Sequence, residues 1–136
     1  MKISVIIPTF NQSQYLPDAL DSLMSQTRKP DEVIVGNDGS TDDTSEIAHR
    51  YAFKVVDQVN KGLASARNTG IMNATGDYIL PLDSDDILQD NALEVLERVA
   101  TETNADVIAP SMKCFGVENH TVVLMPNPKI EDFQVA

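Results

Sequence analysis

The stretch Ile3-Ser4-Val5-Ile6-Ile7-Pro8, residues 3–8, decides the fold class. It is a short, mostly β-branched apolar run that ends in a proline. Such a run is typical of a strand that is buried on both faces of a parallel sheet. We therefore expect a central parallel strand at the start of the chain.

Helices and strands are predicted to alternate after this first strand. Apolar residues at helical spacing from Leu16 predict a helix of about 11 residues, with Pro17 in its first turn. Ser40 or Thr41 is expected to cap a helix that runs to about residue 51, and Asp90 or Asn91 to cap a later one. The other expected elements are strands at 32–37, 53–57, 78–82 and 107–109, a helix at 63–74, and an edge strand at 121–125 that pairs antiparallel. This order predicts an α/β fold, a mostly parallel sheet with helices on both faces.

Length and charge restrict the class of protein. The 136 residues suit one domain. A net charge of -11 opposes general binding to nucleic acid or to anionic lipid. We expect no membrane span and no signal peptide, because no apolar run is long enough and the first strand starts at residue 3. The expected location is the cytoplasm, with peripheral attachment to the inner face of the membrane as the alternative.

Polar residues follow three expected strands at the edge where a parallel sheet binds ligands. Thr9 ends the first strand and Asp38 the second. Asp83, Asp85 and Asp86 follow the fourth, where their repulsion is expected to raise at least one carboxyl pKa. A divalent cation, Mn²⁺ or Mg²⁺, would relieve that repulsion and keep positions open for phosphate oxygens. The alternative is an acidic loop that caps the next helix.

Two further side chains are candidates for binding a nucleotide. Asp38 is suited to accept a hydrogen bond from a base or a ribose hydroxyl, and the alternative is an ordinary turn residue. Arg67 would donate to phosphate, ribose or the acidic cluster, and the alternative is a structural ion pair. Neither a Walker A sequence nor Gly-x-Gly-x-x-Gly occurs in the chain.

Several motifs taken together resemble glycosyltransferase family 2 over roughly residues 3 to 110. The resemblance implies a GT-A fold, a Rossmann-like domain, with a nucleotide-diphosphate sugar donor, a divalent metal and inversion at the anomeric carbon. The whole chain, residues 1–136, would then be one donor-binding domain, the N-terminal half of a longer transferase. The motifs are VIIPTFN (5–11), YL (15–16), EVIV (32–35), NDGSTD (37–42), ARN (66–68) and LDSDD (82–86).

The resemblance also implies roles for single residues. Pro8 and Thr9 fall on donor contacts, Asp38 on the contact to the base, and Arg67 near the nucleotide. Asp83 and Asp85 form the Asp-x-Asp motif. Asp85 is the first choice for the metal, Asp83 faces the ribose or the metal, and Asp86 is a second metal candidate.

The predicted function is inverting transfer of a sugar, with a UDP-sugar favoured as donor, to a glycan, lipid or protein acceptor, as in polysaccharide biosynthesis. The cation would assist departure of the nucleoside diphosphate. No general base is assigned, because the acceptor half of the family has no match in the chain. Alternatives are a non-catalytic nucleotide-sugar-binding module and an inactive fragment. A nucleotidyltransferase is disfavoured, because Thr9–Gln14 lacks Gly and Lys. Self-association through residues 121–136 is also expected.

Overall fold

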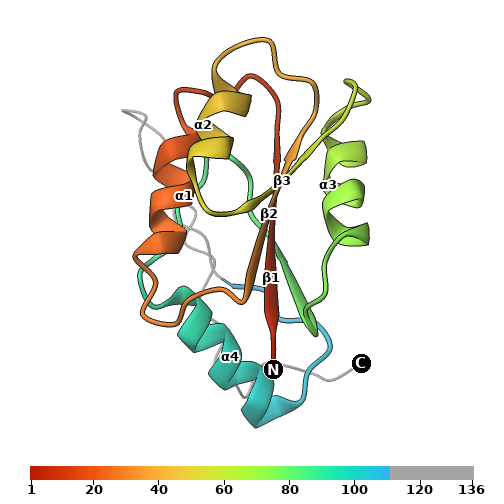
Figure 1. Cartoon of the computed structure of the whole chain (residues 1–136). Coiled ribbons are helices and arrows are strands. Elements are labelled where there is room, and N and C mark those ends of the chain that lie inside the picture. Colours follow the sequence, from red (N-terminus) through yellow and green to blue (C-terminus); the bar gives the residue numbers. More distant parts are fainter. Residues whose placement is uncertain (111–136) are drawn as a thin grey trace, which may run out of the picture. The chain divides into compact units, whose positions relative to one another are not determined.

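Helices and strands alternate without exception in the part of the chain that the structure describes. The structure is a computed structural model and describes residues 1–110. Its contacts divide the chain into two compact units, Met1–Glu94 and Val95–Ala136. The elements in chain order are β1 (Ile3–Thr9), α1 (Leu16–Met24), β2 (Glu32–Asn37), α2 (Thr44–Arg50), β3 (Lys54–Asp57), α3 (Leu63–Met72), β4 (Tyr78–Pro81) and α4 (Ala92–Thr103) (Figure 1).

The sheet has four parallel strands in the order β3-β2-β1-β4. β1 therefore lies inside the sheet, between β2 and β4, and each of its seven residues is buried. Full burial of a side chain such as Ile6 or Ile7 contributes about 1.5–3 kcal/mol. The central parallel strand predicted from residues 3–8 is confirmed.

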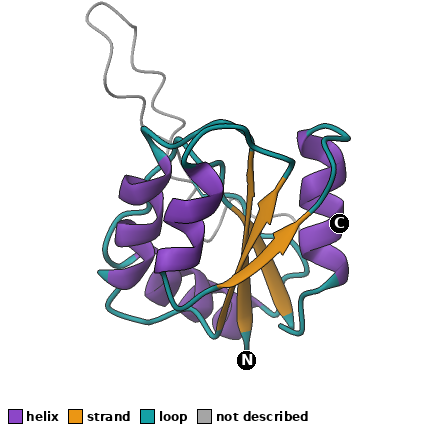
Figure 2. Cartoon of the chain, turned by 45° about the horizontal axis from the view of Figure 1, so that its top comes forward, coloured by secondary structure: helices purple, strands orange, loops and turns teal. Residues whose placement is uncertain are grey.

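Helices cover both faces of this sheet, as the sequence predicts. α1 and α2 lie on one face and α3 on the other (Figures 1 and 2). α1 buries a stripe of Leu16, Leu20 and Leu23 at helical spacing. On the other face α3 approaches β2 so closely that a Cβ on Gly36 would lie 2.7 Å from the backbone oxygen of Ala66. Glycine at this position allows the helix to rest on the strand.

The predicted start of α2 is wrong. The helix begins at Thr44, and neither Ser40 nor Thr41 caps it. Both residues are held in the preceding loop by Asn11: its N–H donates to Ser40 Oγ (3.0 Å), and its Oδ1 accepts from the Thr41 N–H (2.8 Å). A capping side chain must accept a hydrogen bond from the first turn of its own helix, whereas Ser40 and Thr41 are bonded to Asn11 instead.

The strand predicted at 107–109 is also wrong. These residues have no regular structure, and Val107 is 79% exposed. A strand needs a hydrogen-bonded neighbour, and none of the four described strands pairs with this run. Within its own unit, α4 ends in a turn where the Asn104 N–H donates to the Ala100 carbonyl oxygen. The strand predicted at 121–125 lies outside the described residues.

Candidate functional site

The carboxyl ends of the strands bring the predicted ligand-binding residues to one edge of the sheet. In the sheet, β2 lies on one side of β1 and β4 lies on its other side, so the order of strands changes direction at β1. Open parallel sheets bind ligands at such a change of direction, beyond the carboxyl ends of the strands. Thr9 ends β1, Asp38 follows β2 and Asp83 follows β4. Hydrogen bonds connect Thr9 with Asp38, and Asp83 with Arg67 of α3.

Thr9 and Pro8 are both buried at the end of β1. The Thr9 carbonyl oxygen accepts a hydrogen bond from the Asp38 N–H at 2.9 Å, which extends the pairing between the two strands. Thr9 Oγ1, by contrast, is buried without a hydrogen-bond partner in the described part of the chain. A buried hydroxyl without a partner is costly, so this atom is a candidate for contact with a ligand.

Asp38 is buried, with 1% of its surface exposed. Its Oδ1 accepts from Gln58 Nε2 (2.7 Å) and from the Lys61 N–H (2.8 Å), and its Oδ2 accepts from the Gly62 N–H (2.8 Å). Burial alone would raise the pKa of Asp38, but these three donors outweigh it and lower the pKa below its usual value. Asp38 is therefore an ionised carboxylate held by protein donors.

Arg67 lies on α3 and reaches across to the end of β4. Its Nη2 donates to Asp83 Oδ1 at 2.8 Å. The side chains are 39% and 58% exposed, so the pair by itself contributes little to stability. Arg67 Nε is buried and has no hydrogen-bond partner among residues 1–110. The guanidinium thus keeps one donor unused next to the acidic loop.

Asp83, Asp85 and Asp86 are exposed in a tight turn, in which the Asp86 N–H donates to the Asp83 carbonyl oxygen. Desolvation raises the pKa of Asp86, and the charges of Asp85 and Asp83 raise it further. The expected rise of one carboxyl pKa is confirmed. Across residues 1–110, no three His, Cys, Asp or Glu side chains gather so as to hold a metal by themselves. Oxygen donors under mutual repulsion still fit a hard cation that takes its other ligands from a diphosphate.

Two residues near this edge have structural roles that the sequence reasoning missed. Asn11 has a positive φ of 50° and joins the loop after β1 to the loop after β2. Gln58 bonds to Asp38 and accepts from Thr69 Oγ1 on α3 (2.8 Å). Asn11 is the last residue of the motif VIIPTFN (5–11), so the sequence did contain a signal for it. Gln58 lies in no motif, and only the fold brings it to Asp38.

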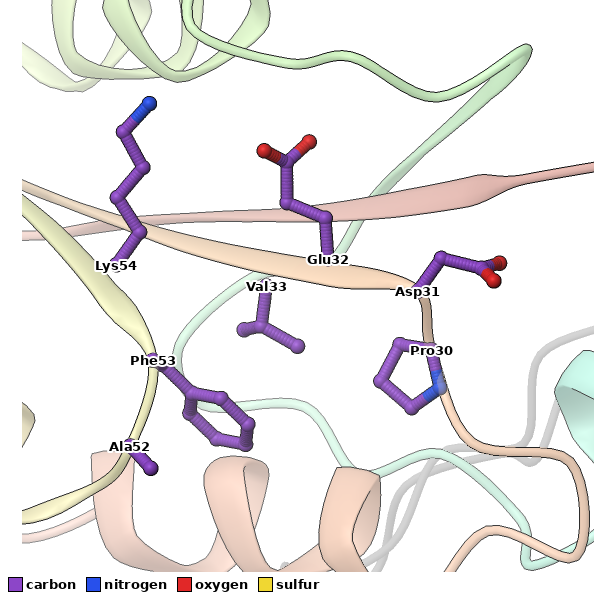
Figure 3. A pocket seen from close by; sticks show the side chains of 7 residues that line it. All are labelled: Pro30, Asp31, Glu32, Val33, Ala52, Phe53 and Lys54. Carbon is purple, nitrogen blue, oxygen red and sulfur yellow. The ribbon is translucent and has the colours of Figure 1, made fainter.

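A surface pocket of about 320 Å³ lies at the opposite ends of β2 and β3 (Figure 3). It is lined by residues at the starts of these strands and contains none of the predicted site residues. One of its side chains, Glu32, already accepts from Ser4 Oγ (2.6 Å) and from the Thr75 N–H (2.9 Å). We therefore assign the candidate site to the carboxyl edge. The lining residues are Pro30, Asp31, Glu32, Val33, Ala52, Phe53 and Lys54.

None of the helices within residues 1–110 has the length and apolar character needed to cross a bilayer.

Comparison with protein families gives a match to the family described as "Glycosyl transferase family 2" over residues 4–134. Among curated proteins, Glycosyltransferase GlyA of Streptococcus pneumoniae is 40% identical over 111 residues, which cover 78% of this chain and 16% of GlyA. Uncharacterized glycosyltransferase YibD of Escherichia coli is 36% identical over 135 residues, which cover 95% of this chain and 39% of YibD. The chain thus spans well under half the length of these relatives.

Solved structures give a similar result. S. aureus TarS 1-349 in complex with UDP-GlcNAc is 34% identical with a TM-score of 0.79, and the match covers 88% of this chain and 37% of that one. Mannosyltransferase PcManGT from Pyrobaculum calidifontis, in complex with GDP-Man and Mn²⁺, is 27% identical with a TM-score of 0.66, and the match covers 84% of this chain and 35% of that one.

Proposed function

Because the chain belongs to glycosyl transferase family 2 and has the GT-A fold of its solved neighbours, we propose that it binds the sugar donor of an inverting glycosyltransferase. The favoured donor is a UDP-sugar, and the acceptor is a hydroxyl group of a glycan, lipid or protein. TarS, solved with UDP and with UDP-GlcNAc, supports this choice of donor. We place the protein in polysaccharide biosynthesis in the cytoplasm, with peripheral attachment to the inner face of the membrane as the alternative.

The observation that carries the proposal is a pair of buried polar atoms, Thr9 Oγ1 and Arg67 Nε, that have no hydrogen-bond partner among the described residues. Both belong to residues that sequence reasoning had already placed at the nucleotide. A bound nucleotide sugar offers hydroxyl and phosphate oxygens to such donors. Pro8 would form the wall beside Thr9, and Asp38 would accept from the base with a lone pair of Oδ2, which has one donor from the protein.

Asp85, with Asp86 as second candidate, would hold a divalent cation, Mn²⁺ or Mg²⁺, and Asp83 would lie between this ion and Arg67. A cation bound here would supply positive charge to the diphosphate leaving group. The neighbour PcManGT, solved with GDP-Man and Mn²⁺, supports this assignment.

The residues of this chain would act on the donor mainly by position and charge. Arg67 would donate to the diphosphate while Asp83 keeps the guanidinium directed toward the acidic loop, so that negative charge is stabilised as the bond to the sugar breaks. The acceptor hydroxyl would attack the anomeric carbon from the face opposite the diphosphate, which inverts that carbon. Its proton needs a base, and we assign no residue to that role.

A nucleotide panel tests the proposal. A ligand that binds only the native state raises the melting temperature. The melting temperature of the full chain is therefore measured with UDP, GDP, dTDP or CDP, each with Mn²⁺ or Mg²⁺. We expect the largest rise with UDP and Mn²⁺. If no nucleoside diphosphate raises the melting temperature at millimolar concentration, the proposed function is wrong.

The second candidate function is a module that binds nucleotide sugar without transferring it. It is favoured by the proposed site, since Asp38, Asp83, Asp85 and Asp86 are all proposed for the donor or the cation, and no other carboxylate of residues 1–110 is assigned to the base. An assay of UDP release and sugar transfer separates the two. Binding of a UDP-sugar without hydrolysis or transfer would support the module.

A further inference from the structure

The segment between β3 and α3, residues 58–62, has little apolar packing of its own. Val59 is 79% exposed, and Asn60, Lys61 and Gly62 are exposed as well. Gly62 has a φ of 92°, in the region that favours glycine. A segment of this kind needs specific hydrogen bonds to keep one conformation.

Asp38 supplies these hydrogen bonds from the turn after β2. Its carboxylate accepts from Gln58 Nε2, the Lys61 N–H and the Gly62 N–H, and so holds both ends of the segment. Asp38 is itself fixed by the bond from its N–H to the Thr9 carbonyl oxygen at 2.9 Å. The segment is thereby tied to the end of β1, the centre of the sheet.

Close backbone packing supports the same interpretation. A Cβ on Gly39, which has a φ of 72°, would lie 2.9 Å from the Asn60 nitrogen and 3.2 Å from the Gln58 carbonyl oxygen. The turn after Asp38 and the segment are therefore in direct contact. Gln58 continues this connection into α3, because Thr69 Oγ1 donates to its Oε1 at 2.8 Å.

The start of α3 depends on this arrangement. Its N-cap is Gly62, no side-chain capping bond is present, and its first turn contains no acidic residue. The first N–H groups of a helix and its dipole favour a negative charge nearby. Asp38 provides that charge from the turn after β2, where its hydrogen bonds outweigh burial and lower its pKa.

We propose that Asp38 is a positioning residue, which fixes segment 58–62 and through it the helix that carries Arg67. Arg67 lies in the second turn of α3 and reaches Asp83, so a change at the start of the helix is passed to that pair. This inference deepens the proposed function, and its ligand-binding part rests on that function. Asp38 would then affect diphosphate binding as well as the base.

The first experiment needs no ligand. Amide hydrogen exchange and the Arg67 Nε–H resonance are followed by NMR in the full chain for wild type and Asp38→Asn. The control is Asp42→Asn, which makes the same change of charge and size at a carboxylate that bonds Ser13 and Thr44 rather than the segment. A second variant, Gln58→Ala, removes one link without changing the charge.

In Asp38→Asn we expect exchange at Lys61 and Gly62 to become roughly tenfold faster or more, because a hydrogen bond to a charged group is lost. The Arg67 Nε–H signal should shift, while the amides of Ile6 and Ile34 stay protected. Gln58→Ala should show a smaller change of the same kind, and it serves in place of Asp38→Asn if that variant unfolds. The inference is overturned if both variants behave like Asp42→Asn.

The second experiment measures binding of inorganic diphosphate and of UDP, each with Mn²⁺, by calorimetry. We expect Asp38→Asn to weaken both ligands several-fold. Loss of UDP affinity with unchanged diphosphate affinity would mean that Asp38 contacts only the nucleoside, and would overturn the link to Arg67. If wild type binds neither ligand, the proposed function is wrong, and the exchange result alone decides whether Asp38 positions the segment.

Discussion

Gly70→Ala is expected to destabilise the protein, although it removes a glycine from the interior of a helix. Alanine in a helix interior is favoured over glycine by about 1 kcal/mol. At this position, however, the new Cβ would come under 3.0 Å from Ile6 Cγ2, and Ile6 is fully buried in β1. Overpacking of this severity costs about 2–3 kcal/mol, so the net loss should be about 1–2 kcal/mol.

Thermal and urea unfolding measure this loss. A change of about 1–2 kcal/mol lowers the melting temperature of a chain of this size by about 3–10 °C. Ile6→Leu provides the control, because leucine keeps the volume of isoleucine but has no methyl group on Cβ. In the Ile6→Leu background, Gly70→Ala should be neutral or stabilising. Stabilisation by Gly70→Ala in wild type, or an equal loss in both backgrounds, would refute the argument.

The remaining predictions concern the acidic loop, the pH dependence of stability and Asn11. Asp85→Ala should abolish the dependence of UDP affinity on Mn²⁺, and calorimetry with and without chelator checks it; equal wild-type affinity in both conditions would contradict the metal assignment. Hydrogen bonds from Thr44 and Ser13 outweigh burial and lower the pKa of Asp42 to about 2. A lowered carboxyl pKa stabilises the fold above the unfolded value of 3.8, and this stabilisation is lost as pH falls toward 2. Urea unfolding between pH 5 and about 2 checks this. The free energy of unfolding should fall less steeply with decreasing pH in Asp42→Asn than in wild type, and an equal slope in both proteins would contradict the prediction. Asn11→Ala should cost about 0.5–1.5 kcal/mol, since two exposed loops lose the acceptor that joins them, whereas Asn11→Asp should recover most of it in the same assay.

The strands were predictable because their signal is local. β2 has the predicted bounds, Glu32–Asn37, around the apolar residues Val33, Ile34 and Val35, and β1 was placed at the centre because it is apolar on both faces. Since the carboxyl ends of parallel strands share an edge, the positions of Thr9, Asp38 and Asp83 followed from the strand assignments alone.

The errors arose where distant residues decide the local structure. Ser40 and Thr41 have the composition of helix caps, but Asn11, about 30 residues earlier, binds them in the loop. The close approach of Ile6 to Gly70 inside α3 was likewise not predicted, because the two residues are 64 positions apart in the chain. Asp38 stays a predicted ligand contact, but its three protein donors, which come from a segment 20 to 24 residues later, were not predicted. No spacing in the sequence indicates these contacts.

The central place of β1 also has a consequence for synthesis on the ribosome. β1 is translated before β4, with which it pairs on one side, and a hydrogen bond at the start of β1 joins Lys2 to Asp77, 75 residues later. A nascent chain therefore carries its most apolar strand with one edge open until β4 has been translated. Open strand edges invite pairing with other chains, and pairings this distant in sequence form slowly. Protein production should consequently depend on chaperones that shield β1 during elongation.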